Sequence, residues 1–383
     1  MIEKIPEKKE KKVEYLELIY DLIFVYIIGR NNSLLHHIQD GFVDPGMLIA
    51  YILCTFAVIQ IWNFTTYYIN IYGRNSLRDH IFLFVNMFLL YFVAEGTREH
   101  WQDYQNQYHF AWGLILINIG IQYVIELRNY KGVPQHQRRI KRITIVLFTE
   151  ALLIFAAIPV YNLTGQVIMA PVAILFGMAA TSITGRNNCN DVVDFTHLSE
   201  RAMLYVVFTF GEMIIAIASY FEGEITFNNL YFAAMAFLIV VGLFLSYGTI
   251  YDHIIDRERQ TNGLSYMMMH VFLIFALNNI TNSLEFMQNE EVQLIPKLSF
   301  LILSLVIYYT FLMLLGRYAK KRCKPTKKYY LLMIAVGISF VGLMFLCKDI
   351  MMLNIGITVI YVFAIFVMFY RFGKKMHREL SSN

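Results

Sequence analysis

Apolar segments of membrane-spanning length recur along the whole 383-residue chain. A helix needs about 20 apolar residues to cross the hydrocarbon core of a bilayer. Segments of this kind lie at residues 15–38, 47–71, 79–96, 107–126, 143–161, 165–184, 199–221, 227–251, 262–284, 296–316, 328–347 and 350–371. The pattern predicts an all-α integral membrane protein with about twelve transmembrane helices. At residues 161–165 and 348–349 the connections are so short that a re-entrant hairpin is an alternative to two full crossings.

The composition supports this class of protein. Hydrophobic residues make up 57% of the chain and charged residues 16%, whereas soluble domains carry about 25% charged residues. Residues 1–13 are polar and rich in lysine, without the apolar stretch of a secretory signal, so we expect the first span to act as its own insertion signal. No long polar insertion interrupts the spans, which predicts a single transmembrane domain over residues 1–383.

Lysine and arginine are concentrated in alternate connections between the spans. The basic connections include residues 128–142 and 317–328, and basic residues also fill both terminal segments. Cytoplasmic loops of membrane proteins carry such an excess. We therefore expect a multipass protein of the cytoplasmic membrane with both termini in the cytoplasm. The same rule explains the net charge of +4, so no nucleic-acid partner is implied.

The positions of these basic segments also suggest a repeat. The two densest basic connections follow the fourth and tenth spans, and Glu17 and Glu200 lie near the starts of the first and seventh. A parallel repeat of two six-helix halves, 14–184 and 197–372, would produce this arrangement. The positive-inside bias alone produces much of it, so both explanations stay open.

Polar side chains inside the spans are the main indication of function. Ionisable groups are costly in hydrocarbon and tend to face a protein interior or a water-filled path. Counted along the helices at about 1.5 Å per residue, four polar residues come to a similar depth, roughly 10–13 Å from the cytoplasmic side. These residues are Asp21, Asn86, Glu150 and His270. We expect at least three of them to meet in one interior cluster that binds a small solute or ion.

A second, outer layer is predicted from Arg30 and Glu212, which both lie about 20 Å from the cytoplasmic side. Opposite charges at one depth in the first and seventh spans predict an ion pair, either a gate or a structural lock between helices. The alternative is that Arg30 extends outward to the lipid headgroups. Helical spacing further places Arg201 on the same face as Glu212, and Glu17 on the same face as Asp21.

The chain carries no G-x-S-x-G, Walker A, H-E-x-x-H or G-x-G-x-x-G motif, so we expect neither enzyme activity nor a cofactor. A zinc hydrolase would need about three deep His or carboxylate ligands, but His270 is the one histidine well inside a span. The four cysteines are widely separated and predict neither a disulfide nor a metal site: Cys54, Cys189, Cys323 and Cys347.

Three motifs resemble those of the bacterial low temperature requirement A (LtrA) family. Residues 17–25 read E-L-I-Y-D-L-I-F-V, similar to the E-L-F-F-D-L-x-F-V start of that family. Its H-x-x-E-R and G-E helix resembles residues 197–212, and its Tyr and His position resembles residues 266–270. Ile19 stands where the family has an aromatic residue, and residues 30–32 also depart from its pattern. The resemblance implies a multipass bacterial inner-membrane protein named for growth in the cold, a name that specifies no mechanism.

These observations favour a proton- or cation-coupled transporter of a small solute. Asp21 and Glu150 would take up the proton or cation, and His270 would titrate or form hydrogen bonds beside them. The cytoplasmic entrance would be organised by Glu17, His197, Glu200 and Arg201. A passive cation channel with the same lining, and a structural or sensory membrane protein, are the alternatives. Expected partners are the lipid bilayer and a small solute, proton or monovalent cation, and a homodimer is compatible with the sequence.

Overall fold

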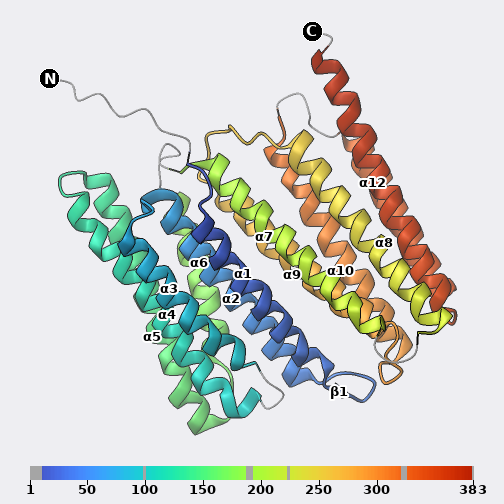
Figure 1. The fold of residues 1–383 in the computed structure, drawn as a ribbon, viewed down its shortest axis with the longest axis horizontal. Helices are drawn as coiled ribbons and strands as arrows, with labels where there is room; N and C mark the ends of the chain where they lie inside the picture. The colour runs from blue at the N-terminus through green and yellow to red at the C-terminus, as the bar shows by residue number, and fades with distance from the viewer. Residues whose placement is uncertain (1–10, 98–100, 187–192, 222–224, 321–325, 382–383) are drawn as a thin grey trace.

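Twelve α-helices account for most of the residues that the computed structural model describes, which are 11–97, 101–186, 193–221, 225–320 and 326–381. The helices lie side by side in an elongated bundle (Figure 1). They are α1 (Tyr15–Asn32), α2 (Pro45–Tyr72), α3 (Leu77–Glu95), α4 (Trp101–Asn129), α5 (Pro134–Thr164), α6 (Met169–Arg186), α7 (Phe195–Ala216), α8 (Phe227–Thr249), α9 (Leu264–Phe286), α10 (Leu294–Leu314), α11 (Lys327–Leu346) and α12 (Met351–Ser381). The predicted all-α membrane fold is confirmed, and each predicted segment corresponds to one helix.

Ten helices in the described ranges are long and apolar enough to cross a membrane. The exceptions are α1 and α6. Three charged residues interrupt the 18 residues of α1, and the apolar part of α6 is short, Met169–Gly185. Although α1 is the more polar helix, it packs against α2, α3 and α7, and its exposed face is apolar, with Ile19 and Leu22. Protein contacts therefore replace lipid along much of its surface.

Local sequence signals set several helix boundaries. Asp44 accepts a hydrogen bond from the Met47 backbone N–H at 2.9 Å and precedes Pro45, a typical start for α2. Ser76 and Asp79 form a capping box at the start of α3. The predicted first span is too long, because α1 ends at Asn32. A 3-10 turn, η1 (Ser33–His36), and the antiparallel hairpin of β1 (Ile38–Gln39) and β2 (Phe42–Val43) follow it.

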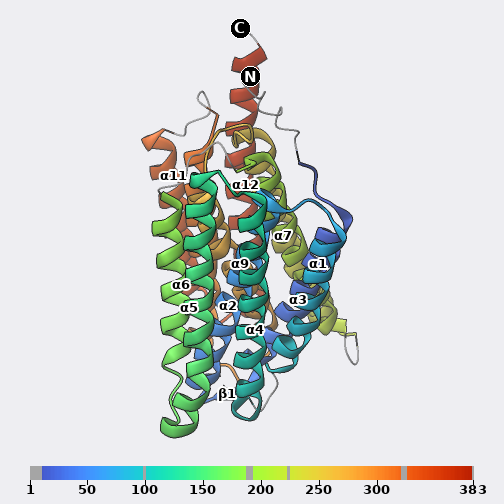
Figure 2. The same cartoon turned by 90° about the vertical axis from the view of Figure 1, so that its left-hand side faces the viewer.

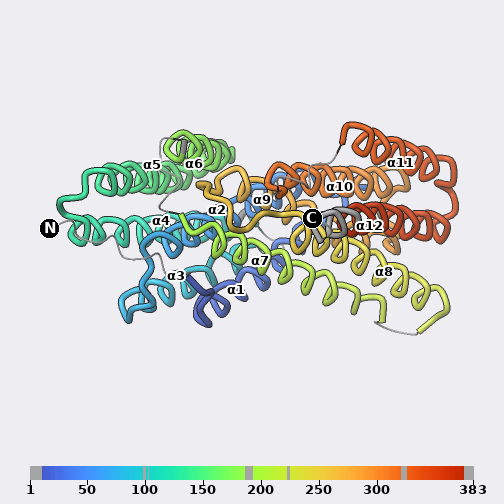
Figure 3. Tube along the Cα trace, turned by 90° about the horizontal axis from the view of Figure 1, so that it is seen from above, coloured from blue at the N-terminus to red at the C-terminus, as the bar shows by residue number. Residues whose placement is uncertain are grey.

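The first six helices occupy one side of the bundle and the last six the other (Figure 1). The two sides meet where α1 and α2 pack against α7 and α9 (Figure 3). Some neighbours correspond between the sides, since α1 packs on α3 as α7 packs on α9, and α2 contacts α6 as α8 contacts α12. This correspondence is compatible with the predicted repeat of two halves, which stays a prediction.

One end of the bundle collects the basic segments. The start of α1 and the end of α12 lie at the same end (Figure 2). The connection between α4 and α5, within the basic run 128–142, also lies there (Figure 1). The opposite end carries the β1–β2 hairpin.

Of the cysteines, Cys54 and Cys347 are free, while Cys189 and Cys323 lie outside the described residues.

At the end with the hairpin, His36 of η1 places Nε2 3.0 Å from the Glu285 carboxylate of α9. This hydrogen bond raises the pKa of His36 above its usual value. The pair therefore stabilises the fold fully below the ordinary histidine pKa of about 6.5, and the contribution is lost as the pH rises through the raised value. Since His36 is largely exposed, we expect less than about 1 kcal/mol.

We expect His36→Gln to lower the thermal unfolding temperature slightly at pH 6 and to leave it unchanged at alkaline pH, because the glutamine cannot carry the charge. Thermal unfolding of the purified protein across this range measures the effect. His80→Gln, at the other end of the bundle, is the matched control. Identical pH profiles for wild type and His36→Gln would contradict the prediction.

Candidate functional site

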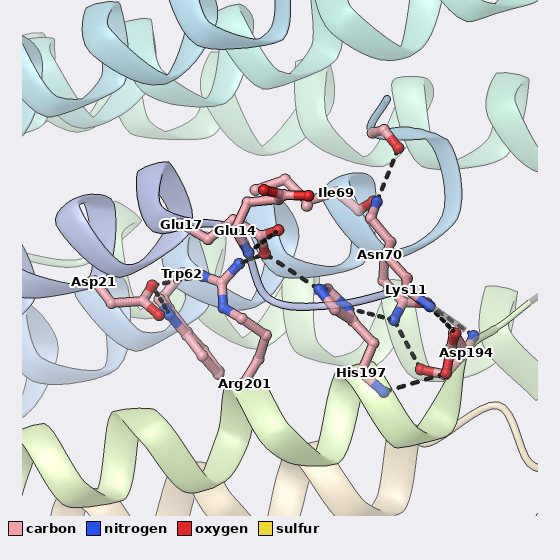
Figure 4. Close-up of polar contacts among 11 residues, drawn as sticks. Lys11, Glu14, Glu17, Asp21, Trp62, Ile69, Asn70, Asp194, His197 and Arg201 are labelled. Carbon is pink, nitrogen blue, oxygen red and sulfur yellow. Dashed lines mark hydrogen bonds and ion pairs between the residues drawn. The ribbon is translucent and has the colours of Figure 1, made fainter. Parts of the chain in front are cut away.

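A fully buried arginine joins the first helix to the seventh. Arg201 of α7 lies between two carboxylates of α1: Nη1 donates to Glu17 Oε2, and Nη2 donates to Asp21 Oδ1 at 2.5 Å (Figure 4). Trp62 of α2 donates from Nε1 to the same Asp21 oxygen at 2.9 Å. Glu17 and Asp21 are one helical turn apart and face α7 together, as their spacing predicts. Three helices thus share one buried charged group.

The network continues toward the basic end of the bundle through His197, one turn before Arg201. Its Nε2 lies 3.3 Å from Glu17 Oε2, and its Nδ1 lies 3.0 Å from the Asn70 side-chain nitrogen. An amide N–H can only donate, so Nδ1 accepts and the proton on Nε2 faces Glu17. Asn70 also donates to the Asp194 backbone carbonyl at 2.8 Å, which fixes the end of α2 against the start of α7.

Lys11 closes this end of the network. Its Nζ donates to the backbone carbonyls of Ile69 and Gly73 in the last turn of α2, and its backbone N–H donates to Asp194 Oδ2 at 3.1 Å (Figure 4). A lysine is favourable at a helix C-terminus, where the carbonyls have no helical partner. Burial lowers the pKa of Lys11. The segment before α1 is therefore attached to both α2 and α7.

The predicted entrance residues divide into two groups. Glu17, His197 and Arg201 belong to the buried network described above. Glu200 forms no hydrogen bond or ion pair with any described residue, because one residue along a helix is a rotation of about 100° and turns it away from the network. Part of the predicted entrance is thus a set of contacts between α1, α2 and α7, and Glu17 also borders a cavity of about 810 Å³ at the basic end.

The members of the predicted inner cluster are not bonded directly to one another. No hydrogen bond or ion pair in the described ranges joins any two of its members, Asp21, Asn86, Glu150 and His270. Asn86 accepts from Asn118 Nδ2 at 2.8 Å. His270 lies 3.0 Å from the Tyr247 hydroxyl. The estimate of depth gave the height of each residue in the membrane, but it did not give the direction in which its side chain points.

Arg30 and Glu212 do not form the predicted ion pair. Arg30 instead pairs with Glu95 of α3, with Nη2 3.9 Å from the carboxylate, and both side chains are partly exposed. The Glu212 carboxylate lies against Gly29, so close that a Cβ atom on that glycine would overlap it. Gly29 faces α7, and the rotation of one residue turns Arg30 toward α3.

Glu150 of α5 is a buried carboxyl group that no described residue pairs with. It is 0% exposed, and neither carboxylate oxygen has a hydrogen-bond partner among the described residues. The side chains of Glu150 and of Gln60 in α2 both lie against Gly177 of α6. A Cβ atom on this glycine would overlap both of them, so the two side chains are neighbours. Gln60 is itself 8% exposed, and its amide oxygen and nitrogen have no partner in the described part of the chain.

A cavity of about 420 Å³ adjoins this pair, with Gln60 and Gly177 in its wall. It extends along α2 from Phe56 to Tyr67, about 16 Å, and its other walls come from α6, α9 and α10. Further lining residues include Asn63, Met178, Thr181, Ser265, Met268 and Phe311. Gln60 was not among the residues predicted from the sequence. The feature that could have pointed to it is its position as the one polar residue within the apolar run 57–62.

The described residues contain no group of three or more His, Cys, Asp or Glu side chains that could hold a metal ion.

The family model described as Bacterial low temperature requirement A protein (LtrA) matches residues 12–366, nearly the whole chain. This match confirms the resemblance seen in the three motifs. No curated protein and no solved structure matches the chain.

The buried network predicts a specific pattern of stability. Arg201→Met leaves Glu17 and Asp21 buried without a counter-charge, so we expect a loss of about 3–5 kcal/mol of folding free energy, seen as a large drop in thermal unfolding temperature. The triple variant Glu17→Gln, Asp21→Asn, Arg201→Met removes all three charges and should recover much of this loss. Arg257→Met, at an exposed site, is the control. A triple variant less stable than Arg201→Met would contradict the assignment.

Proposed function

Because the chain belongs to the LtrA family of multipass membrane proteins and holds an unpaired buried carboxyl beside a cavity, we propose that it is a proton- or cation-coupled transporter of a small solute. The observation that carries the proposal is Glu150, because it is the one predicted ion-binding carboxylate that the protein has not already neutralised. Asp21, the other candidate, is bound by Arg201 and Trp62.

The electrostatics of Glu150 favour coupling. An isolated ionised carboxylate is costly in a low-dielectric interior, so the group is either protonated or accompanied by a cation. No described residue supplies that cation. The charge state of Glu150 therefore depends on what occupies the adjacent cavity, and a proton and a solute are thermodynamically linked when each changes the affinity for the other.

The α1–α7 network supplies a joint between the two sides of the bundle. Alternating access in secondary transporters is largely a movement of one bundle of helices against another. The contact of α1 and α2 with α7 and α9 is where such a movement would occur here. Arg201 joins α1 to α7, and Asp21 joins α1 to α2. Non-covalent polar contacts therefore hold these three helices together at this interface. We assign these residues a positioning role, distinct from the solute site at Glu150.

The basic end of the bundle faces the cytoplasm in this proposal, and the cell membrane is the site of action. Fusions of a fluorescent protein, active in the cytoplasm, and of alkaline phosphatase, active in the periplasm, to the C-terminus test the orientation. We expect fluorescence and no phosphatase activity, because the basic segments gather at this end. Phosphatase activity of the C-terminal fusion would show that the C-terminus lies in the periplasm, and would contradict this orientation.

Transport is tested with the purified full-length protein in liposomes that contain a pH-sensitive dye. A panel of cations and metabolites is added outside, and we expect at least one to cause saturable proton movement. Glu150→Gln should lower its rate at least tenfold, because glutamine cannot exchange a proton. Glu258→Gln, at an exposed site, should leave the rate unchanged. Single-channel currents in a planar bilayer, or proton movement independent of Glu150, would contradict the proposal.

A further inference from the structure

We infer that the cavity beside Glu150 binds an amphipathic organic monocation, which competes with a proton for the Glu150 carboxylate. The inference rests on the proposed function, since it names the class of solute that the same site would take. It depends on three features of the cavity, which are the isolation of the carboxyl group, the chemistry of the walls and the route from the basic end.

The first feature is that no charged side chain among the described residues pairs with Glu150. The facing stretches 57–64 of α2, 113–120 of α4 and 173–181 of α6 contain no charged residue. Burial alone, without an interaction with any charged group, governs its electrostatic environment. Basic groups occur at the cavity mouth, where Arg317 is exposed, and in a small adjoining pocket lined by Arg139. The described residues next to the carboxylate thus leave its charge unpaired when it is ionised, while Arg317 adds one positive charge at the cavity mouth.

The second feature is the wall. Aromatic rings line the cavity from α2 and α10, including Phe56, Phe64, Tyr67 and Phe311. Ring faces attract cations, and the attraction is largest for cations that are weakly hydrated. Methionines line the side formed by α6 and α9, and their flexible thioethers adapt to irregular apolar shapes. Small inorganic cations are instead bound by several oxygen ligands that converge on one point. The oxygen-bearing side chains of this wall come from α2, α6, α9 and the segment before α9, and are distributed along the cavity: Gln60, Asn63, Tyr67, Thr181, Ser182, Asn262 and Ser265.

The third feature is size and access. A cavity of about 420 Å³ lies within the range of small-molecule sites, roughly 300–1,000 Å³. Its lining runs from Arg317 and Asn262, at the basic end of the bundle, inward to Phe56. Gly177 has no side chain to separate the cavity from the pair of Gln60 and Glu150, so a bound cation can approach the carboxylate. The exchange is balanced, because the cation enters as the Glu150 proton leaves to the solvent.

The test uses two probes of the same shape and opposite charge, tetraphenylphosphonium and tetraphenylborate, with the full-length protein in detergent. Titration calorimetry in buffers of different ionisation enthalpy gives the affinity and the number of protons released. We expect the phosphonium ion to bind, to release up to one proton per cation, and to bind up to tenfold more weakly for each unit by which the pH is lowered. Tetraphenylborate should bind at least tenfold more weakly than the phosphonium ion.

Variants at the site separate charge from folding. Glu150→Gln should weaken phosphonium binding at least tenfold and abolish both proton release and pH dependence, whereas Glu150→Asp keeps the charge and should retain proton release. Gly177→Ala should weaken binding by moving Gln60 and Glu150, as its Cβ atom would overlap both. Glu258→Gln is the control with unchanged affinity. Thermal unfolding of each variant confirms that it is folded.

The outcomes distinguish this inference from the proposed function. Equal binding of both probes, or phosphonium binding that ignores pH and Glu150→Gln, means that the cavity accepts any apolar body and overturns the inference. Glu150-dependent proton movement with a neutral solute, and no phosphonium binding, overturns the inference while transport stands. Proton-competitive phosphonium binding without any flux in liposomes supports the cation site and contradicts transport.

Discussion

Arg201, enclosed between Glu17 and Asp21, is the interaction on which the arrangement of this bundle depends. A guanidinium with no exposure to solvent is tolerated only when carboxylates and hydrogen bonds replace its hydration. Those partners must come from α1, the helix whose three charges make it the poorest candidate for contact with lipid. The charges of α1 and α7 therefore require each other, and this requirement brings the two sides of the bundle together.

The molecule separates two uses of buried carboxylates. Around Arg201 the carboxylates are neutralised by a fixed cation and by donors from α2, so their geometry is set before any solute arrives. At Glu150 the protein supplies no counter-charge and leaves an amide, a glycine and a cavity instead. Fixed charge pairs hold helices together, whereas an unpaired carboxyl responds to its occupant. The two sites are thus suited to different tasks, one to position and the other to bind.

The sequence predicted the fold well, because helix length and hydrophobicity are encoded locally in each segment. The shared face of Glu17 and Asp21 was equally accessible, since it depends on the rotation of a single helix. Contacts between helices were harder. Arg30 and Glu212 have matching depths, yet each turns to a different neighbour. Asn86 and His270 likewise bind separate partners, and Glu150 faces Gln60 at Gly177. Depth follows from counting residues, while the orientation of one helix toward another follows from packing along its whole length. Gln60 was missed for this reason, since only its meeting with Glu150 at Gly177 distinguishes it from other polar residues in spans.

The attachment of Lys11 extends the interior of the protein to its amino-terminal arm. Through the end of α2, through Asp194 and through His197, this residue is only a few contacts away from Arg201. Lys11 is therefore part of the polar interior, although it precedes the first helix. Loss of the Lys11 contacts would consequently affect the seam between α2 and α7, beyond the short segment in which this lysine lies.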